Sequence, residues 1–469
     1  MKRAISLLVL TVLLSFTGVA NAEAKTFRNC AELRKTYKYG VAASSKAVNV
    51  GPGPIFKPRV LASVYRANIR MDLDKDRIIC EVVRPRTNPT PAPTESPSSE
   101  LPKLDLCRIT QGSNPNGVIR TGFPRSPELA LKNNKAVVQL IYVDFPDLSD
   151  PKPPSADVDF WRNGVDKFFD AMSESTVDFE WRFENKYHRM PKPITAYGIT
   201  RAGAGNFTQF VQDAITLADP TVDFTDVDFV VAVMPPNVTR EQADVSPALI
   251  TSGSSFSTRE GNIFRATMAA ADTRFNEGYL LIAHEFGHLL GLQDYYYFGW
   301  NRSMPFHDQF KFMGQFDNMN FATGKSKEWV AWNRWALGFL ADSKVRCLAK
   351  GVAAQTDHIL VPGSAAISGS QMVVVPTSNT SAIVIESRRN LRYDSSAAPI
   401  SNGLLVYRVD TLKSSGFGPI EVIKKPTTAD LFLADAPLRK GETITVDGVT
   451  ITNLDSGTNW DLARVTISN

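Results

Sequence analysis

The chain has 469 residues, of which 43% are hydrophobic and 21% are charged. This composition is typical of a soluble globular protein and excludes a disordered or fibrous one. The length favours two or three domains over a single core. The 52 basic and 48 acidic residues leave a net charge of only +4. Without a basic stripe, so small a surplus argues against a nucleic-acid partner.

The N-terminus has the pattern of an export signal. Lys2 and Arg3 give a positive start, residues 4–16 are almost wholly apolar, and Ala20-Asn21-Ala22 matches a small-x-small cleavage site. The apolar run is shorter than the roughly 20 residues that a membrane-spanning helix needs. We therefore expect residues 1–22 to be a signal peptide, cleaved after Ala22, rather than an anchor. No later stretch is long and apolar enough to span a membrane.

A proline-rich stretch over residues 84–103 separates a small N-terminal module, residues 23–83, from the rest of the chain. Such a composition cannot bury a core and favours an extended linker. The four cysteines fit an exported protein, in which free thiols are seldom kept, and they allow three pairings. Because the linker lies between the first two cysteines and the last two, we expect the disulfides to be Cys30–Cys80 and Cys107–Cys347.

Residues 104–344 mix strand and helix periodicities, which is typical of an α+β domain. In chain order, we expect a strand over 136–145, a helix over 158–172, a strand over 177–183, a helix over 207–218, a buried strand over 227–234 and a helix over 279–290. From residue 345 to residue 469 the pattern changes to short β-type runs separated by Gly, Ser, Asn and Asp. This pattern predicts a sandwich-like all-β domain.

The helix expected over 279–290 carries the strongest chemical signal in the chain. Two of the five histidines, His284 and His288, are four residues apart with Glu285 between them. Residues at this spacing share one helix face, so both imidazoles can reach one Zn²⁺. Glu285 is then placed to take a proton from a water that the metal activates. The motif therefore predicts a zinc hydrolase.

The residues after this helix supply a candidate third ligand. Gly291 is a natural helix end, and a sharp turn there would bring Asp294 back toward the metal. Three protein ligands and one open position define a catalytic zinc site rather than a structural one. Three alternatives stay open: a histidine pair that holds no metal, Asp294 as a supporting residue behind the ligands, and Glu277 as the third ligand.

The run HEFGHLLGLQD, residues 284–294, resembles the HExxHxxGxxD signature of the immune inhibitor A family of metallopeptidases, which are relatives of the metzincins. FDNMN, residues 316–320, is similar to the methionine-bearing turn of that family. The resemblance covers roughly residues 130–469 and implies a zincin-like catalytic domain followed by a β domain. It implies that His284, His288 and Asp294 bind zinc, that Glu285 is the general base, and that Met319 lies beneath the metal. Met313 is the alternative for that last role.

One position departs from the metzincin pattern. Several such enzymes place a tyrosine two residues after the turn methionine, where it can stabilise the oxyanion, but this chain has Phe321 there. Phenylalanine cannot donate a hydrogen bond. The oxyanion donor is therefore unassigned, with Tyr295, Tyr296 and Tyr297 as candidates and ordinary aromatic packing as the alternative for each.

The N-terminal module carries an acidic loop. Its candidate calcium ligands are Asp72, Asp74, Asp76 and Glu81, because alternating carboxylates surround Ca²⁺ with oxygens. A solvated acidic turn is the alternative. The segment resembles the excalibur domain, a calcium-binding module of bacterial surface and secreted proteins. Arg77 stands where that pattern has glycine, which puts calcium affinity in question. The resemblance implies a bacterial, extracellular protein with a role for cell-wall or surface association.

Together these features predict a secreted zinc endopeptidase that acts on protein or peptide substrates, with Zn²⁺ and a second, calcium-type site. Two other functions share part of the evidence. One is an extracellular adhesion protein with a structural zinc. The other is a zinc hydrolase of non-peptide amides, which would use the same motif residues.

Overall fold

A computed structural model describes residues 25–47, 55–72, 76–82, 104–112, 117–201, 205–251, 255–349, 353–364 and 369–468. The expected signal peptide and most of the expected linker lie outside these ranges. The chain divides into two compact units, residues 1–87 and 88–469, so the boundary falls inside the expected linker. Within the described residues, no helix combines the length and the apolar character needed to cross a membrane.

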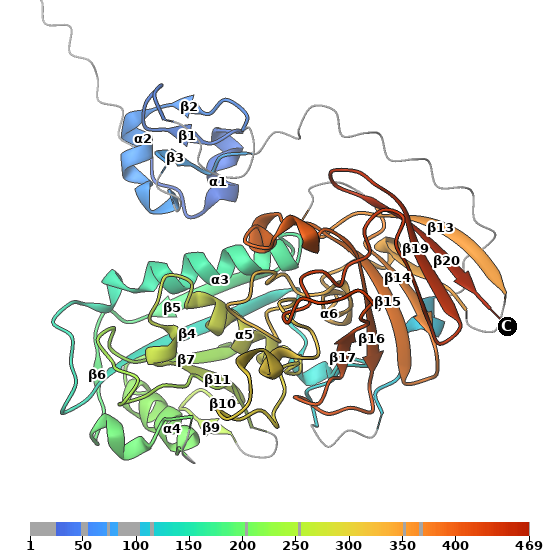
Figure 1. Cartoon of the computed structure of the whole chain (residues 1–469). Coiled ribbons are helices and arrows are strands. Elements are labelled where there is room, and N and C mark those ends of the chain that lie inside the picture. The colour runs from blue at the N-terminus through green and yellow to red at the C-terminus, as the bar shows by residue number, and fades with distance from the viewer. Residues whose placement is uncertain are drawn as a thin grey trace, which may run out of the picture. The chain divides into compact units, whose positions relative to one another are not determined.

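The N-terminal unit is small (Figure 1) and contains one disulfide. Its elements are α1 (Cys30–Thr36), β1 (Val41–Ala42), β2 (Arg59–Val60), α2 (Ala62–Ala67) and β3 (Ile78–Ile79), with the strands in the order β2-β1-β3. Asn29 caps α1 by accepting a hydrogen bond from the backbone N–H of Glu32. Leu33, Val41 and Ile79 form the buried centre. The Cys30–Cys80 bridge joins α1 to the end of β3, which is the pairing expected from the linker.

The second unit begins with a mixed sheet in the order β5-β4-β7-β11-β8. Its strands are β4 (Lys135–Asp144), β5 (Asp178–Phe183), β7 (Phe229–Val233), β8 (Leu249–Ile250) and β11 (Arg265–Ala269), and β6 (His188–Arg189) pairs with the end of β4. The first four strands of the sheet are parallel, whereas β8 runs antiparallel to β11 at the edge. A short hairpin of β9 (Phe256–Ser257) and β10 (Asn262–Ile263) follows β8.

Helices cover both faces of this sheet (Figure 1). They are α3 (Val158–Met172) and α5 (Tyr279–Leu289) on one face and α4 (Phe207–Ala218) on the other. Alternate residues of β4 explain the division, because Leu140 and Tyr142 pack with α3 and α5 while Ile141 and Val143 pack with α4. The helix that bears the histidine motif is therefore buried against the centre of the sheet.

Two further sheets form the C-terminal part, in the orders β12-β14-β15-β16-β17 and β13-β20-β19-β18. Their strands are β12 (Val345–Cys347), β13 (Ala354–Leu360), β14 (Met372–Pro376), β15 (Ser381–Arg388), β16 (Gly403–Asp410), β17 (Ile420–Val422), β18 (Thr443–Val446), β19 (Val449–Ser456) and β20 (Asp461–Ile467). Residues of both sheets, such as Val373, Ile383, Ile451 and Val465, share one buried core. The two sheets therefore pack on each other through this core.

The second unit has a core that is continuous across residue 345. The other face of the five-stranded sheet contributes Val374, Leu405 and Tyr407 to the cluster that contains α3, α5 and the short helix α6 (Ala331–Ala336). The Cys107–Cys347 bridge joins the start of this unit to β12. The catalytic and β segments predicted from the sequence thus fold into one compact body of mixed α/β type with several sheets.

Candidate metal centre

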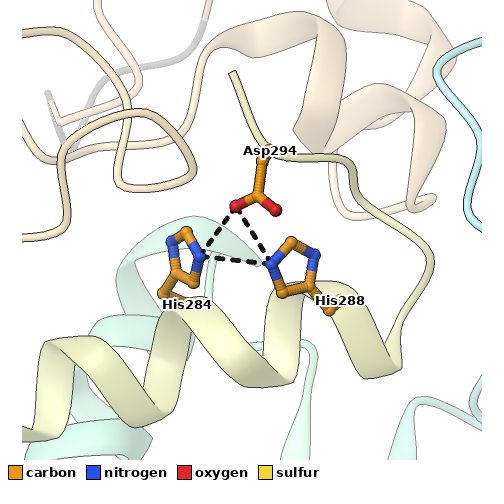
Figure 2. Close-up of side chains that lie close together, drawn as sticks. All are labelled: His284, His288 and Asp294. Carbon is orange, nitrogen blue, oxygen red and sulfur yellow. Dashed lines mark hydrogen bonds and ion pairs between the residues drawn. The ribbon is translucent and has the colours of Figure 1, made fainter. Parts of the chain in front are cut away.

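Three side chains converge at the C-terminal end of α5 (Figure 2). His284 and His288 project from the same face of the helix, and Asp294 reaches them from the segment that follows it. The Asp294 Oδ1 atom lies 3.1 Å from His284 Nε2 and 3.2 Å from His288 Nε2. The two Nε2 atoms are 3.2 Å apart. All three side chains are buried, with exposed fractions of 9% or less.

The turn at Gly291 brings Asp294 back over the helix. Gly291 has a φ of +103°, a conformation that residues with a Cβ rarely adopt. The backbone N–H of Leu292 donates to the carbonyl of Gly287 at 2.9 Å, which closes the helix end. The expected role of Gly291 as a helix stop thus agrees with the structure.

Hydrogen bonds fix the orientation of both imidazoles. His284 Nδ1 lies 2.9 Å from the carbonyl oxygen of Asn318, and His288 Nδ1 lies 2.8 Å from that of Leu292. A carbonyl oxygen only accepts, so in each neutral ring the proton is on Nδ1 and the Nε2 lone pair faces Asp294. In metal sites, a hydrogen bond from the ring nitrogen that does not bind the metal orients each histidine ligand in this way.

The donor set fits a small divalent cation. Asp294 Oδ1 is buried without a hydrogen-bond donor of suitable geometry, and two imidazole lone pairs face it. Zinc bonds of about 2.0–2.1 Å in a tetrahedron place neighbouring donor atoms roughly 3.3–3.4 Å apart, close to the spacing found here. Although burial favours the neutral acid, the positive charge that the two imidazoles carry when protonated lowers the pKa of Asp294 below its usual range, so the carboxylate is ionised beside a cation. The cluster therefore attracts positive charge.

Glu285 lies beside these residues in an open cleft. The cleft has a volume of about 560 Å³ and is lined by all three residues of the cluster, by Glu285 and by Tyr296. The carboxylate of Glu285 accepts a hydrogen bond of 2.6 Å from the backbone N–H of Ala248, just before the edge strand β8. Burial raises the pKa of Glu285, so its affinity for a proton is higher than that of an exposed glutamate.

Met319 packs directly against the motif helix. A Cβ atom at Gly287, between the two histidines, would lie 2.5 Å from Met319 Sδ and 3.2 Å from a ring carbon of Trp329. The backbone N–H of Met319 donates to Asp317 Oδ1 at 2.7 Å, which anchors the turn. The close packing explains why glycine occupies the middle of this helix. Met313 is buried in the same core, but the contact with Gly287 is made by Met319.

The three consecutive tyrosines have different surroundings. Tyr295 is buried, and its hydroxyl donates to Asn333 Oδ1 at 2.7 Å. Tyr297 packs its ring against Phe312 and Phe417. Tyr296 alone of the three lines the cleft, where its ring stacks near His284 with 6.3 Å between the ring centroids.

Phe321 and Glu277 lie outside the cluster of His284, His288 and Asp294. Phe321 lines the cleft and stacks on Phe310 with ring centroids 3.9 Å apart. Glu277, the alternative third ligand, pairs with Lys327 at 2.8 Å. Among the described residues, the side chains that could together hold a metal ion are those of His284, His288 and Asp294, and Glu277 is not part of this group.

The acidic loop of the N-terminal unit is partly described. Asp72 Oδ2 accepts hydrogen bonds from the Tyr65 hydroxyl and from the backbone N–H of Arg77. Arg77 has a φ of +71°, the left-handed conformation for which glycine is preferred. Asp76 is buried and accepts from the backbone N–H of Ile78 at 2.7 Å.

The two remaining calcium candidates are Asp74 and Glu81. Asp74 lies outside the described residues. The backbone carbonyl of Glu81 accepts a hydrogen bond from Arg34. Calcium binding by the set Asp72, Asp74, Asp76 and Glu81 stays a prediction.

Some residues of the site had no signal in the sequence. Ser415, which also lines the cleft, bonds to Asp294 from a position 121 residues away. Arg201 lines the cleft as well, and its guanidinium pairs with the buried Asp272 at 3.0 Å. Contacts over such separations depend on the tertiary fold, so neither could be read from local spacing.

The chain is similar to a curated bacterial protein over part of its length. No protein-family profile matches the chain. The "Uncharacterized protein YhjA" of Bacillus subtilis (strain 168) is 45% identical over 86 residues, which are 17% of this chain and 97% of that protein. Over that segment, the chain belongs to the YhjA family. The name of YhjA describes no activity, so the match assigns no function to this chain.

Proposed function

We propose that this protein is a secreted zinc endopeptidase in which His284, His288 and Asp294 hold the metal. The observation that carries the proposal is the buried donor set, in which two oriented imidazole nitrogens and one carboxylate oxygen lie 3.1–3.2 Å apart. The open cleft beside it leaves room for water and substrate, as a catalytic zinc site requires. The two disulfides agree with export to an oxidising compartment.

The chain's own residues supply the other parts of a hydrolysis. When bound, zinc would provide Lewis-acid activation of the water and of the scissile carbonyl. Glu285 would accept the proton of the attacking water and pass it to the leaving amine, a task that its raised pKa favours. The hydroxyl of Tyr296 would donate a hydrogen bond to the oxyanion from the cleft wall.

The edge of the mixed sheet favours an extended peptide as the substrate. Strand β8 pairs with β11 on one side and is the last strand in its sheet among the described residues. Ala248 and Ile250 line the cleft beside Glu285. An extended peptide can add to such an edge by main-chain hydrogen bonds. This feature favours a peptidase over a hydrolase of small non-peptide amides.

The proposal is tested by metal analysis together with proteolysis. The purified protein should contain one zinc per chain, cleave casein, lose activity with a chelator and regain it with Zn²⁺. Asp294→Ala should lose zinc, whereas the matched control Glu277→Ala should retain both zinc and activity. A wild-type protein that holds zinc on four protein ligands and cleaves no peptide would support the adhesion alternative instead. Cleavage of non-peptide amides alone would support the third function.

A further inference from the structure

The third residue of the metal centre is held by the C-terminal β layers. The backbone N–H of Asp294 donates to Ser415 Oγ at 2.8 Å, and the carbonyl of Asp294 accepts from the backbone N–H of Gly416 at 2.9 Å. Both polar groups of the Asp294 backbone are thus bonded to one loop, which connects β16 to β17. By contrast, the carbonyl partners of His284 and His288 lie in residues 279–344.

The same loop also contacts the segment that follows Asp294. The backbone N–H of Phe298 donates to the carbonyl of Gly416 at 3.1 Å. Gly416 has a φ of +75°, and a Cβ atom there would lie 2.1 Å from the ring of Phe298. The loop is itself fixed at its base, since the Thr411 hydroxyl donates to the carbonyl of Thr110 at 2.7 Å. Glycine is therefore required where the loop meets the metal-binding segment.

We propose that Ser415 and Gly416 are positioning residues that place Asp294 for metal binding, so that the C-terminal β layers form part of the metal centre. The inference rests on the proposed metal site but not on the identity of the substrate. It gives the β part of the chain a role in holding zinc. Side chains that hold a ligand in place affect metal affinity strongly, with losses of about 10–100-fold when they are changed.

Zinc affinity in the full chain tests the inference without an activity measurement. The dissociation constant is measured by competition with a chromophoric chelator for the wild type and for Ser415→Ala, Ser415→Thr and Ser414→Ala. We expect Ser415→Ala to bind zinc about tenfold more weakly, since the acceptor for the Asp294 N–H is lost. Ser415→Thr keeps a hydroxyl and should keep most of the affinity. Ser414, whose hydroxyl is not part of this contact, is the matched control.

Gly416→Ala provides a second, independent variant. The added methyl group must displace Phe298 or the loop, so we expect a loss of zinc affinity at least as large as that of Ser415→Ala. Circular dichroism of the metal-free variants shows whether each one is folded. An unchanged zinc affinity in folded Ser415→Ala and Gly416→Ala would overturn the inference. A wild type that binds zinc but cleaves no peptide would overturn the proposed function and leave this inference standing.

Discussion

The contact between Gly287 and Met319 gives a prediction whose sign can be worked out. Alanine in place of glycine inside a helix stabilises it by about 1 kcal/mol. The new Cβ would, however, lie 2.5 Å from Met319 Sδ. Overpacking in a buried core costs about 1–3 kcal/mol. We therefore expect Gly287→Ala to lower the free energy of unfolding by about 0–2 kcal/mol.

The same substitution should have the opposite effect once the sulfur is removed. Met319→Ala alone should cost about 2–5 kcal/mol, because it leaves a cavity in the core. In that background the contact with Met319 is gone and Trp329, 3.2 Å from the new Cβ, is the close neighbour that remains, so Gly287→Ala should gain helix propensity and stabilise by up to about 1 kcal/mol. Urea unfolding of the four proteins with a chelator present measures the cycle without a contribution from zinc. If Gly287→Ala destabilises both backgrounds equally, the packing explanation for this glycine is wrong.

Two further predictions concern Tyr296 and a buried acid. Tyr296→Phe should lower kcat by about 10²–10³-fold at unchanged zinc content, because the oxyanion loses a hydrogen-bond donor. The control Tyr297→Phe should keep wild-type kinetics. A loss of zinc in Tyr296→Phe would show instead that the hydroxyl positions the metal. Burial raises the pKa of Asp166 to about 7. The stability contributed by its protonated form is present below its unfolded pKa of about 4 and is lost as pH rises through 7. Asp166→Asn should therefore be as stable as the wild type at pH 4 and more stable than it at pH 8, by roughly 2 kcal/mol after allowance for partial exposure. Thermal or urea unfolding at the two pH values measures this difference. Equal stability of the two proteins at both pH values would show that the pKa of Asp166 is not raised.

The parts of the site that sequence predicts are those set by local geometry. The spacing of His284 and His288 places both on one helix face, and Gly291 in the left-handed region ends that helix. The proline-rich segment separates the cysteines into the two pairs that the structure contains. Each of these follows from a short-range property of the chain.

The parts that escaped sequence reasoning depend on contacts between distant segments. Nothing near Asp294 indicates that Ser415 holds its backbone. Three adjacent tyrosines look alike in sequence, but in the fold the Tyr295 N–H bonds to the carbonyl of Met319 while Tyr296 lines the cleft. The boundary at residue 345 marks a change of strand pattern, but the core continues across it because one sheet face packs on the helices.

The role of Glu285 as the base of a zinc-dependent peptidase is tested by one paired experiment. Zinc content and casein cleavage are determined for the wild type and for Glu285→Ala. We predict one zinc per chain in both proteins, cleavage by the wild type, and loss of cleavage in the variant, because the proton acceptor is removed while the metal-binding residues remain. Undiminished cleavage by zinc-loaded Glu285→Ala would show that Glu285 is not the base.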